Sequence, residues 1–157
     1  MQAIVCVSEN WGIGLDGRPL FHLSADLKRF RELTTGKTVV YGFRTLKTFP
    51  GGKPLAGRRN IILTHSETPI EGAELAHTVE EAVALAGGDA IVIGGASVYA
   101  LLRPCFDRVR ATKVFAAPEA DSFFPNLDTH PDWRVESESG VMEENGLKFQ
   151  YVDYVKK

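Results

Sequence analysis

The stretch AIVIGGASVYALL, residues 90–102, joins an apolar run to an amphipathic segment through the consecutive glycines Gly94 and Gly95. Residues 90–93 are apolar and mostly β-branched, which is typical of a buried strand. Residues 97–102 space their apolar side chains as a helix does. A buried strand that leads straight into a helix is the repeating unit of folds built on a parallel sheet. This stretch therefore predicts an α/β protein.

The segments on either side continue this alternation. Buried strands are expected at residues 2–8, 38–41 and 59–64. Helices are expected at residues 24–33, 43–49 and 78–86. Three later segments read as strands without helices between them, at residues 108–115, 133–138 and 148–155. We therefore expect a single domain, residues 1–157, with a central, mostly parallel twisted sheet, helices on both faces and an antiparallel C-terminal edge.

The composition predicts an ordinary globular protein that handles small molecules. Hydrophobic residues make up 44% of the 157 positions and charged residues 24%, which disfavours disorder. A net charge of −2 without a basic stripe disfavours nucleic acid as a partner. The first residues carry neither a basic region nor a long apolar run, so we expect no signal peptide, no membrane span and a cytoplasmic location. Cys6 and Cys105 lie far apart without clustered histidines, which argues against a disulfide or a zinc site.

The segment SADLKRFREL, residues 24–33, carries an acid on the helix side expected to face the core. Asp26 lies three residues after Leu23 and four before Phe30, and residues at these separations share a helix face. Leu27 and Leu33 belong to the same expected apolar stripe. The solvent side is expected to consist of Lys28, Arg29, Arg31 and Glu32.

Two interpretations of Asp26 are open at this point. In the first, the acid complements the helix dipole in the first turn, behind Ser24 as the expected N-cap. In the second, the carboxylate lies at the floor of a cleft, where it binds a cationic or amidine-like ring and is tuned for proton transfer.

Two glycine-rich segments are candidates for nucleotide contact. Residues 12–17 match the pattern G-x-G-x-x-G after a strand, but residues 18–20, RPL, do not continue as a helix. We interpret this match as accidental and the segment as a flexible loop or lid. Gly94 and Gly95 form the better phosphate site, because free N–H groups at a helix start favour anions. The alternative is a tight structural turn between strand and helix.

Taken in order, several motifs resemble the dihydrofolate reductase family along nearly the whole chain. They are residues 12–14, 21–30, Gly42 with Thr45, residues 53–61, 93–99 and 123–125. The resemblance implies hydride transfer from C4 of NADPH to C6 of 7,8-dihydrofolate with protonation at N5, which yields 5,6,7,8-tetrahydrofolate for one-carbon metabolism. It also implies a monomer that binds antifolates such as trimethoprim or methotrexate, with no metal and no covalent intermediate.

The resemblance also assigns roles around the substrate. Asp26 would bind N3 and the 2-amino group of the pterin and support protonation of N5, with Thr112 joined to it through water. Phe21 and Tyr99 complete the implied catalytic set. Arg58 would hold the α-carboxylate of the folate glutamate tail. The pterin and aminobenzoate pocket would be lined by Ile4, Cys6, Leu27, Phe30, Phe49, Leu55 and Ile93.

The implied cofactor contacts cover three regions of the chain. The nicotinamide would lie near Cys6, Ile13, Gly14 and Tyr99. The diphosphate would lie near Thr45 and the turn formed by Ile93, Gly94, Gly95, Ala96, Ser97 and Val98. The remaining contacts would come from Gly17 and Arg18 in the loop and, at the adenosine end, from Arg44, Thr64, His65 and His77.

The chain departs from the family pattern at three places. Residues 19–21 read PLF where the family usually has Leu-Pro-Trp, so the aromatic ring beside the pterin persists without an indole N–H. Phe43 and Ser97 stand where many members place basic residues, which thins the cationic clamp for the cofactor phosphates. Arg44 and His65 remain available for a 2′-phosphate, so NADPH is the expected cofactor.

Two other functions stay open from the sequence. One is the related reductase of riboflavin synthesis, which shares the fold but acts on a ribosylated pyrimidine phosphate; Arg58 and Asp26 together favour folate. The other is a pterin or nucleotide binding module that has lost catalysis, as the departures at Phe21, Phe43 and Ser97 would allow.

Overall fold

The computed structural model describes all 157 residues. The main sheet contains β1 (Gln2–Val7), β3 (Thr38–Gly42), β4 (Arg59–Leu63), β5 (Ala73–Ala76), β6 (Ile91–Gly94), β7 (Arg108–Val114), β9 (Trp133–Glu138), β10 (Met142–Glu144) and β11 (Leu147–Lys156). A second, two-stranded sheet is formed by β2 (Gly12–Gly14) and β8 (Ser122–Phe123). The helices are α1 (Ser24–Thr34), α2 (Phe43–Leu46), α3 (Val79–Ala86) and α4 (Ala96–Leu102), with single 3-10 turns at Pro50–Gly52 and Arg103–Cys105.

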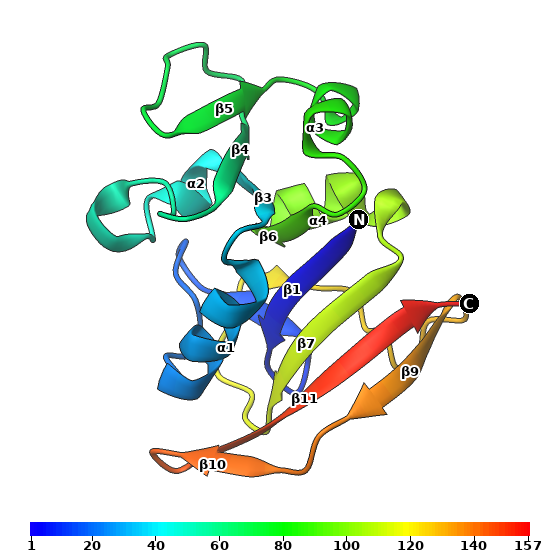
Figure 1. The fold of residues 1–157 in the computed structure, drawn as a ribbon. Helices are drawn as coiled ribbons and strands as arrows, with labels where there is room; N and C mark the ends of the chain where they lie inside the picture. The colour runs from blue at the N-terminus through cyan, green and yellow to red at the C-terminus, as the bar shows by residue number, and fades with distance from the viewer.

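The strand order of the main sheet is β10-β11-β7-β1-β6-β3-β4-β5, with β9 also paired to β11 (Figure 1). The strands from β7 to β5 in this order run parallel to one another. In contrast, β11 runs antiparallel to β7, β9 and β10, which confirms the predicted antiparallel edge. The link between β10 and β11 is a tight turn at Asn145 and Gly146, with φ of 51° and 80°, and such turns join antiparallel strands.

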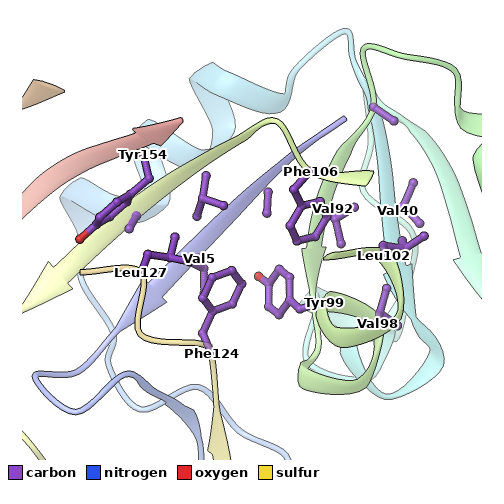
Figure 2. Packing of buried hydrophobic residues seen from close by; sticks show 14 of the residues in the cluster. Val5, Val40, Val92, Val98, Tyr99, Leu102, Phe106, Phe124, Leu127 and Tyr154 are labelled. Atoms are coloured by element: carbon purple, nitrogen blue, oxygen red, sulfur yellow. The ribbon is translucent and has the colours of Figure 1, made fainter. Parts of the chain in front are cut away.

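Helices cover both faces of the sheet, as predicted. Successive residues of a strand point to opposite faces, and on β3 both faces carry apolar side chains that pack against helices. On β3, Val40 belongs to the largest buried cluster, which also contains side chains of α3 and α4. Its neighbours Val39 and Tyr41 pack on the other side with Leu46 of α2. Figure 2 shows the largest cluster, in which Tyr99 points from α4 toward residues of the sheet. None of the helices is both long enough and apolar enough to cross a membrane.

The glycine-rich segment after β1 is a hairpin, which corrects the expectation of a loop throughout. After β2, the chain turns at Asp16 and Gly17, with φ of 52° and 78°, and Leu15 and Arg18 exchange two backbone hydrogen bonds of 3.0 Å. The Asp16 amide donates to Asp121 Oδ2 at 3.0 Å, beside the β2–β8 pairing. No helix begins within the glycine segment, and α1 starts only at Ser24, so the match to the dinucleotide pattern is accidental. Sequence reasoning also missed β5, β8 and β10, because two to four residues carry too little periodicity.

The start of α1 is capped by a residue from the other end of the chain. The prediction of Ser24 as N-cap is wrong, since the N-cap position is Leu23 and no side chain of the helix caps it. Instead the Ser24 and Ala25 amides donate to the two carboxylate oxygens of Glu144 on β10, at 2.7 and 3.0 Å. These backbone hydrogen bonds lower the pKa of Glu144. The β10–β11 hairpin therefore satisfies the free amides of the helix that carries Asp26.

Replacing Glu144 by Gln is expected to lower the Tm at neutral pH, because the helix loses a charge-assisted cap. Since folding lowers the pKa of Glu144, its stabilising effect is complete above the pKa of the unfolded carboxyl and is lost as pH falls through the folded value. The difference in Tm between the variant and the parent should therefore narrow in acid. Thermal unfolding across pH tests this, with Glu143→Gln on the same strand as the control. An equal difference at neutral and strongly acidic pH would contradict the prediction.

Candidate active site

Three neighbouring strands place a row of side chains beneath α1. Cys6 on β1 pairs with Thr112 on β7, and Thr112 pairs in turn with Tyr151 on β11. Paired residues on adjacent strands point to the same face, so the three side chains form one row across the sheet. Asp26 lies over this row, because the Thr112 hydroxyl donates to its Oδ1 at 2.5 Å. The sheet therefore fixes the position of the acid.

The contact between Asp26 and Thr112 is direct, so the prediction that water joins them is wrong. Burial raises the pKa of the Asp26 carboxyl, while the Thr112 hydrogen bond, the charge of Arg29 and a hydrogen bond from the Cys6 thiol act in the opposite direction. Burial and the nearby carboxylate raise the pKa of Cys6, which keeps the thiol neutral. Asp26 makes no hydrogen bond to the backbone of its own helix, so capping does not account for it.

The face of α1 that packs on the sheet differs from the expected stripe. Leu27 is 47% exposed, so its assignment to the apolar stripe is wrong. Arg29 was expected in solvent but is half-buried, with its guanidinium carbon 3.9 Å from the centre of the Tyr151 ring. Asp26, Phe30 and Leu33 are half-buried as predicted. The helix turns Asp26 and Arg29, three residues apart, toward the strands and leaves Leu27 at their side.

The predicted pocket residues come from two separate apolar clusters. Cys6 and Phe21 pack against the buried cluster of Leu23, Val114 and Phe149. Phe49, Leu55 and Ile93 pack against the cluster around α2. Each of these side chains is only half-buried, as are Ile4 and Phe30, so each has apolar surface left for a ligand.

Asn60 organises the loop between α2 and β4, and sequence reasoning missed it. This side chain is buried, and its Oδ1 accepts from the Tyr41 hydroxyl at 2.7 Å and from the Leu55 amide at 3.0 Å. Its Nδ2 donates to the carbonyls of Leu55 and Arg58 at 2.9 and 3.0 Å. The Asn60 side chain thus holds the backbone at Leu55 and Arg58, the two residues of this loop that are predicted to bind substrate. A polar residue at the start of an otherwise apolar strand was the available signal.

Arg58 lies beside the C-terminal end of α1. Its Nε donates to Thr34 Oγ1 at 3.1 Å, and its Nη1 donates to the Ala56 carbonyl at 2.8 Å. These bonds hold the guanidinium in one orientation with no carboxylate partner in the chain. Burial, with the nearby charge of Arg31, lowers the pKa of Arg58. The structure therefore presents a fixed and uncompensated cation.

The turn from β6 into α4 leaves its backbone open to a ligand. Gly94 has a φ of 141°, a conformation that side-chain-bearing residues rarely adopt. A methyl group added at Gly94 or Gly95 would lie 3.3 or 3.4 Å from Thr45 Oγ1, so two glycines and Thr45 form a narrow cradle. Val98 and Gly42 also meet there, since a methyl group on Gly42 would lie 3.0 Å from Val98. These residues fit a phosphate-bearing group, which needs close approach to backbone N–H groups.

The other predicted cofactor residues lie on α4, on α2, after β4 and β5, and on or after β2. Ala96 is half-buried and Ser97 exposed at the start of α4, while Arg44 is exposed on α2. Thr64 follows β4 and His77 follows β5, and the His77 Nδ1 lies 2.9 Å from the Thr64 carbonyl. His65 is exposed beside them. Ile13 and Gly14 lie on β2, and Gly17 and Arg18 lie in the turn that follows it.

Tyr99 is buried, and in the structure it packs in the core and donates a hydrogen bond to the backbone. Its hydroxyl donates to the Ile4 carbonyl at 2.6 Å, and its ring meets Phe124 edge to face at 5.1 Å between centres. It also comes within 3.9 Å of a methyl group added at Gly94. Tyr99 thus links β1 to the glycine turn.

The predicted site residues gather at the carboxyl ends of the parallel strands. Cys6 and Thr112 lie near the ends of β1 and β7, and the glycine turn lies at the end of β6. Thr45 follows β3, and Thr64 follows β4. In open α/β sheets, ligands bind at this edge. The fold and the site define an α/β enzyme that brings a half-buried carboxylate and a phosphate cradle to one edge of its sheet.

Comparison with known proteins identifies the family. The family model described as dihydrofolate reductase matches residues 1–156. The dihydrofolate reductase of Neisseria meningitidis serogroup B is 34% identical over 158 residues, which cover 98% of this chain and 96% of the relative. That of Bacillus subtilis is 31% identical over 159 residues, covering 98% and 93%. The structure of dihydrofolate reductase from Enterococcus faecalis, complexed with NADP(H) and RAB-propyl, has 33% identity and a TM-score of 0.87, covering 99% and 95%.

The chain belongs to the dihydrofolate reductase family. It is an enzyme of this kind, which reduces 7,8-dihydrofolate to 5,6,7,8-tetrahydrofolate with NADPH. The resemblance read from the sequence and the predicted α/β fold are confirmed. The family match also decides against the reductase of riboflavin synthesis and against a module without catalysis.

Replacing Asn60 by Ala is expected to lower the free energy of unfolding by about 1–3 kcal/mol, because buried hydrogen-bonding groups lose their partners. The loop that carries Leu55 and Arg58 should also loosen, so the KM for dihydrofolate should rise more than kcat falls. Denaturant unfolding and steady-state kinetics test both effects, with the exposed Asn126→Ala as the control. An unchanged KM in a destabilised variant would show that Asn60 does not position the loop.

Proposed function

We propose that Asp26 is the pterin anchor of this reductase and that Thr112 and Cys6 hold it in place. The observation that supports this role is the carboxylate seated on the row of Cys6, Thr112 and Tyr151 with no bond to its own helix. A carboxylate has about four acceptor positions, and the Thr112 hydroxyl uses one of them, on Oδ1. The others are available to N3–H and the 2-amino group of the pterin, whose planar edge suits a bidentate pair.

The chemistry needs a fixed ring and a proton at N5. NADPH supplies the hydride, from C4 of its nicotinamide, when it is bound. Asp26 fixes the aminopyrimidine edge of dihydrofolate, so that C6 meets the hydride in one geometry. Because burial raises the pKa of Asp26 while Thr112 and Arg29 lower it, the carboxyl is tuned between two opposing effects. Its negative charge beside the pterin favours the protonated form of the ring at N5.

The rest of the substrate is proposed to lie along the half-buried apolar side chains. Ile4 and Phe30 line the pterin side together with Cys6 and Phe21, and the exposed Leu27 borders it from α1. Phe49, Leu55 and Ile93 line the aminobenzoate side, on the α2 face. Arg58 pairs with the α-carboxylate of the glutamate tail, since its guanidinium is oriented by Thr34 and Ala56 and has no acidic partner. Antifolates such as trimethoprim and methotrexate would occupy the same site through Asp26.

NADPH is proposed to bind across the glycine turn. Gly94, Gly95, Ala96, Ser97 and Val98, with Thr45, would hold the diphosphate. Cys6, Ile13, Gly14, Ile93 and Tyr99 would surround the nicotinamide, with Gly17 and Arg18 closing over it. Arg44, Thr64, His65 and His77 would contact the adenosine end. Arg44 and His65 are exposed and carry the preference for NADPH over NADH, in place of the basic residues absent at Phe43 and Ser97.

We further propose that the chain is a single domain over residues 1–157, a monomer, and a cytoplasmic protein. The continuous main sheet joins the first strand to the last, which supports the single domain. Dihydrofolate reductases of bacteria are its relatives, and none of its helices could cross a membrane.

Replacing Asp26 by Asn is expected to reduce turnover of dihydrofolate at neutral pH by about 10²- to 10⁴-fold. Part of the rate should return at low pH, where the substrate is protonated in solution. Because folding raises the pKa of Asp26, its ionisation costs stability as pH rises through the folded value, so the Asn variant should have an equal or higher Tm at neutral pH. Cofactor absorbance and thermal unfolding test this. Normal turnover at neutral pH would show that Asp26 is not the anchor.

Replacing Arg58 by Gln is expected to raise the KM for dihydrofolate by about 10- to 100-fold with little change in kcat, because a charged hydrogen bond to the substrate is lost. Binding of a pterin that lacks the glutamate tail should not change. Arg59→Gln is the matched control, since Arg59 is ion-paired with Glu74 at 2.7 Å. If both substitutions raise KM equally, Arg58 does not hold the tail.

A further inference from the structure

Arg29 lies on α1 about one turn after Asp26, and its side chain packs on the strand β11. Its guanidinium carbon lies 3.9 Å from the centre of the Tyr151 ring, and its Nη2 lies 3.6 Å from Asp153 Oδ1. Tyr151 and Asp153 are two residues apart on β11, so their side chains leave the same face of the strand. One guanidinium therefore stacks on the first and faces the second. Its side chain is only 22% exposed, so this is not an ordinary surface arginine.

Asp153 holds this arginine and is itself held by the neighbouring strand. Its Oδ2 accepts from Arg110 Nη1 at 3.0 Å and lies 3.8 Å from Arg108 Nη1, and both arginines come from β7. Its Oδ1 is buried and accepts no hydrogen bond, and the cation closest to it is Arg29. Asp153 is 14% exposed, so the pair is partly shielded from water. Asp153 is therefore held by two arginines of β7, and it in turn holds Arg29 of α1.

The groups that act on Asp26 come from β1, β7, β10 and its own helix. Thr112 on β7 donates a hydrogen bond to it, and Cys6 on β1 lies next to Thr112 in the same row. Glu144 on β10 adds a negative charge that disfavours a second anion. Tyr151 on β11 lies beside Thr112 in the same row of side chains, and burial and the charge of Asp26 raise the pKa of its phenol. Arg29 is placed beside this group by geometry, since its guanidinium lies over Tyr151, and the strand partner of Tyr151, Thr112, holds the carboxylate. While burial raises the pKa of Asp26, the charge of Arg29 lowers it.

We propose that Arg29 is a positioning residue for the reduction: clamped by Tyr151 and Asp153, its guanidinium keeps the Asp26 carboxylate anionic in the free enzyme. Asp26 and Arg29 are three residues apart, and side chains at this separation are neighbours on one face of a helix. The clamp matters because a free arginine side chain would extend into water, where its charge is screened. This inference rests on the proposed role of Asp26 as pterin anchor. It adds the group that sets the protonation state of that anchor.

The titration of Asp26 in the ligand-free protein tests the proposal without reference to catalysis. The protein is labelled with aspartate carrying ¹³C at the carboxyl carbon, and the Asp26 resonance is identified by its absence from Asp26→Asn. In Arg29→Gln the titration midpoint of Asp26 should move to higher pH by about 0.5–1 unit. Lys28→Gln is the matched control, because it removes one positive charge from the exposed side of the same helix and should leave the midpoint unchanged.

Two further variants separate charge from packing. Arg29→Lys keeps the charge and should stay close to the parent midpoint, whereas Arg29→Met keeps the apolar stem and should shift as Arg29→Gln does, which also covers a failure of the Gln variant to fold. Unchanged midpoints in both uncharged variants would overturn the proposal and leave Arg29 as a structural link. An equal shift in Arg29→Lys would overturn it as well, since packing would then be the cause.

The proposal also predicts a change in how dihydrofolate binding depends on pH. The pH dependence of dihydrofolate binding should follow the titration midpoint, so the pH range in which Arg29→Gln binds substrate well should move upward by the same amount. A merely destabilised variant would lower the Tm without moving this profile. If Asp26→Asn turned over normally, the proposed anchor would fail while the NMR titration still reported on Arg29, so the two failures are distinguishable.

Discussion

The seat of Asp26 on the sheet is the interaction on which the rest of the structure depends. Thr112 holds the carboxylate directly, and Cys6 and Tyr151 extend the row on either side. Removing a carboxylate from water is costly unless hydrogen bonds and a nearby cation compensate. The strand register supplies the hydrogen bonds, and α1 supplies the cation through Arg29. The acid is therefore kept where the sheet and the helix meet, without bonding to its own helix.

Distant parts of the chain support this one contact. The amides at the start of α1 are satisfied by Glu144, which is brought there by the β10–β11 hairpin. At the other end of α1, Thr34 receives Arg58, whose loop is held by Asn60. A helix whose two ends are tied to different loops cannot shift without disturbing both. The predicted folate contacts thus share one support, the position of α1 on the sheet.

Much of the fold could be predicted because its strands are long and its helices periodic. The strand, two glycines and helix of residues 90–102 appear as β6 and α4, and Thr78 and Gly87 bound α3 as their capping chemistry indicates. The short strands β2, β5, β8 and β10 were missed because so few residues show no period. Ser24 looks like an N-cap, but a charged carboxylate from β10 takes its place. The charge-assisted hydrogen bonds to the Glu144 carboxylate thus replace the capping by Ser24 that local propensity favours.

The sequence by itself determined the family and the alternation of strands and helices, and it singled out Asp26 as the proposed anchor, because these rest on residue order and local spacing. Only the tertiary structure decided what surrounds that acid. Thr112, Tyr151 and Glu144 lie more than 80 residues from Asp26 in the chain, and the pairing of β7, β10 and β11 together with the packing of α1 brings them together. Whether Leu27 or Arg29 faced the sheet depended on the rotation of α1, which is set by packing on the strands and not by the helical period.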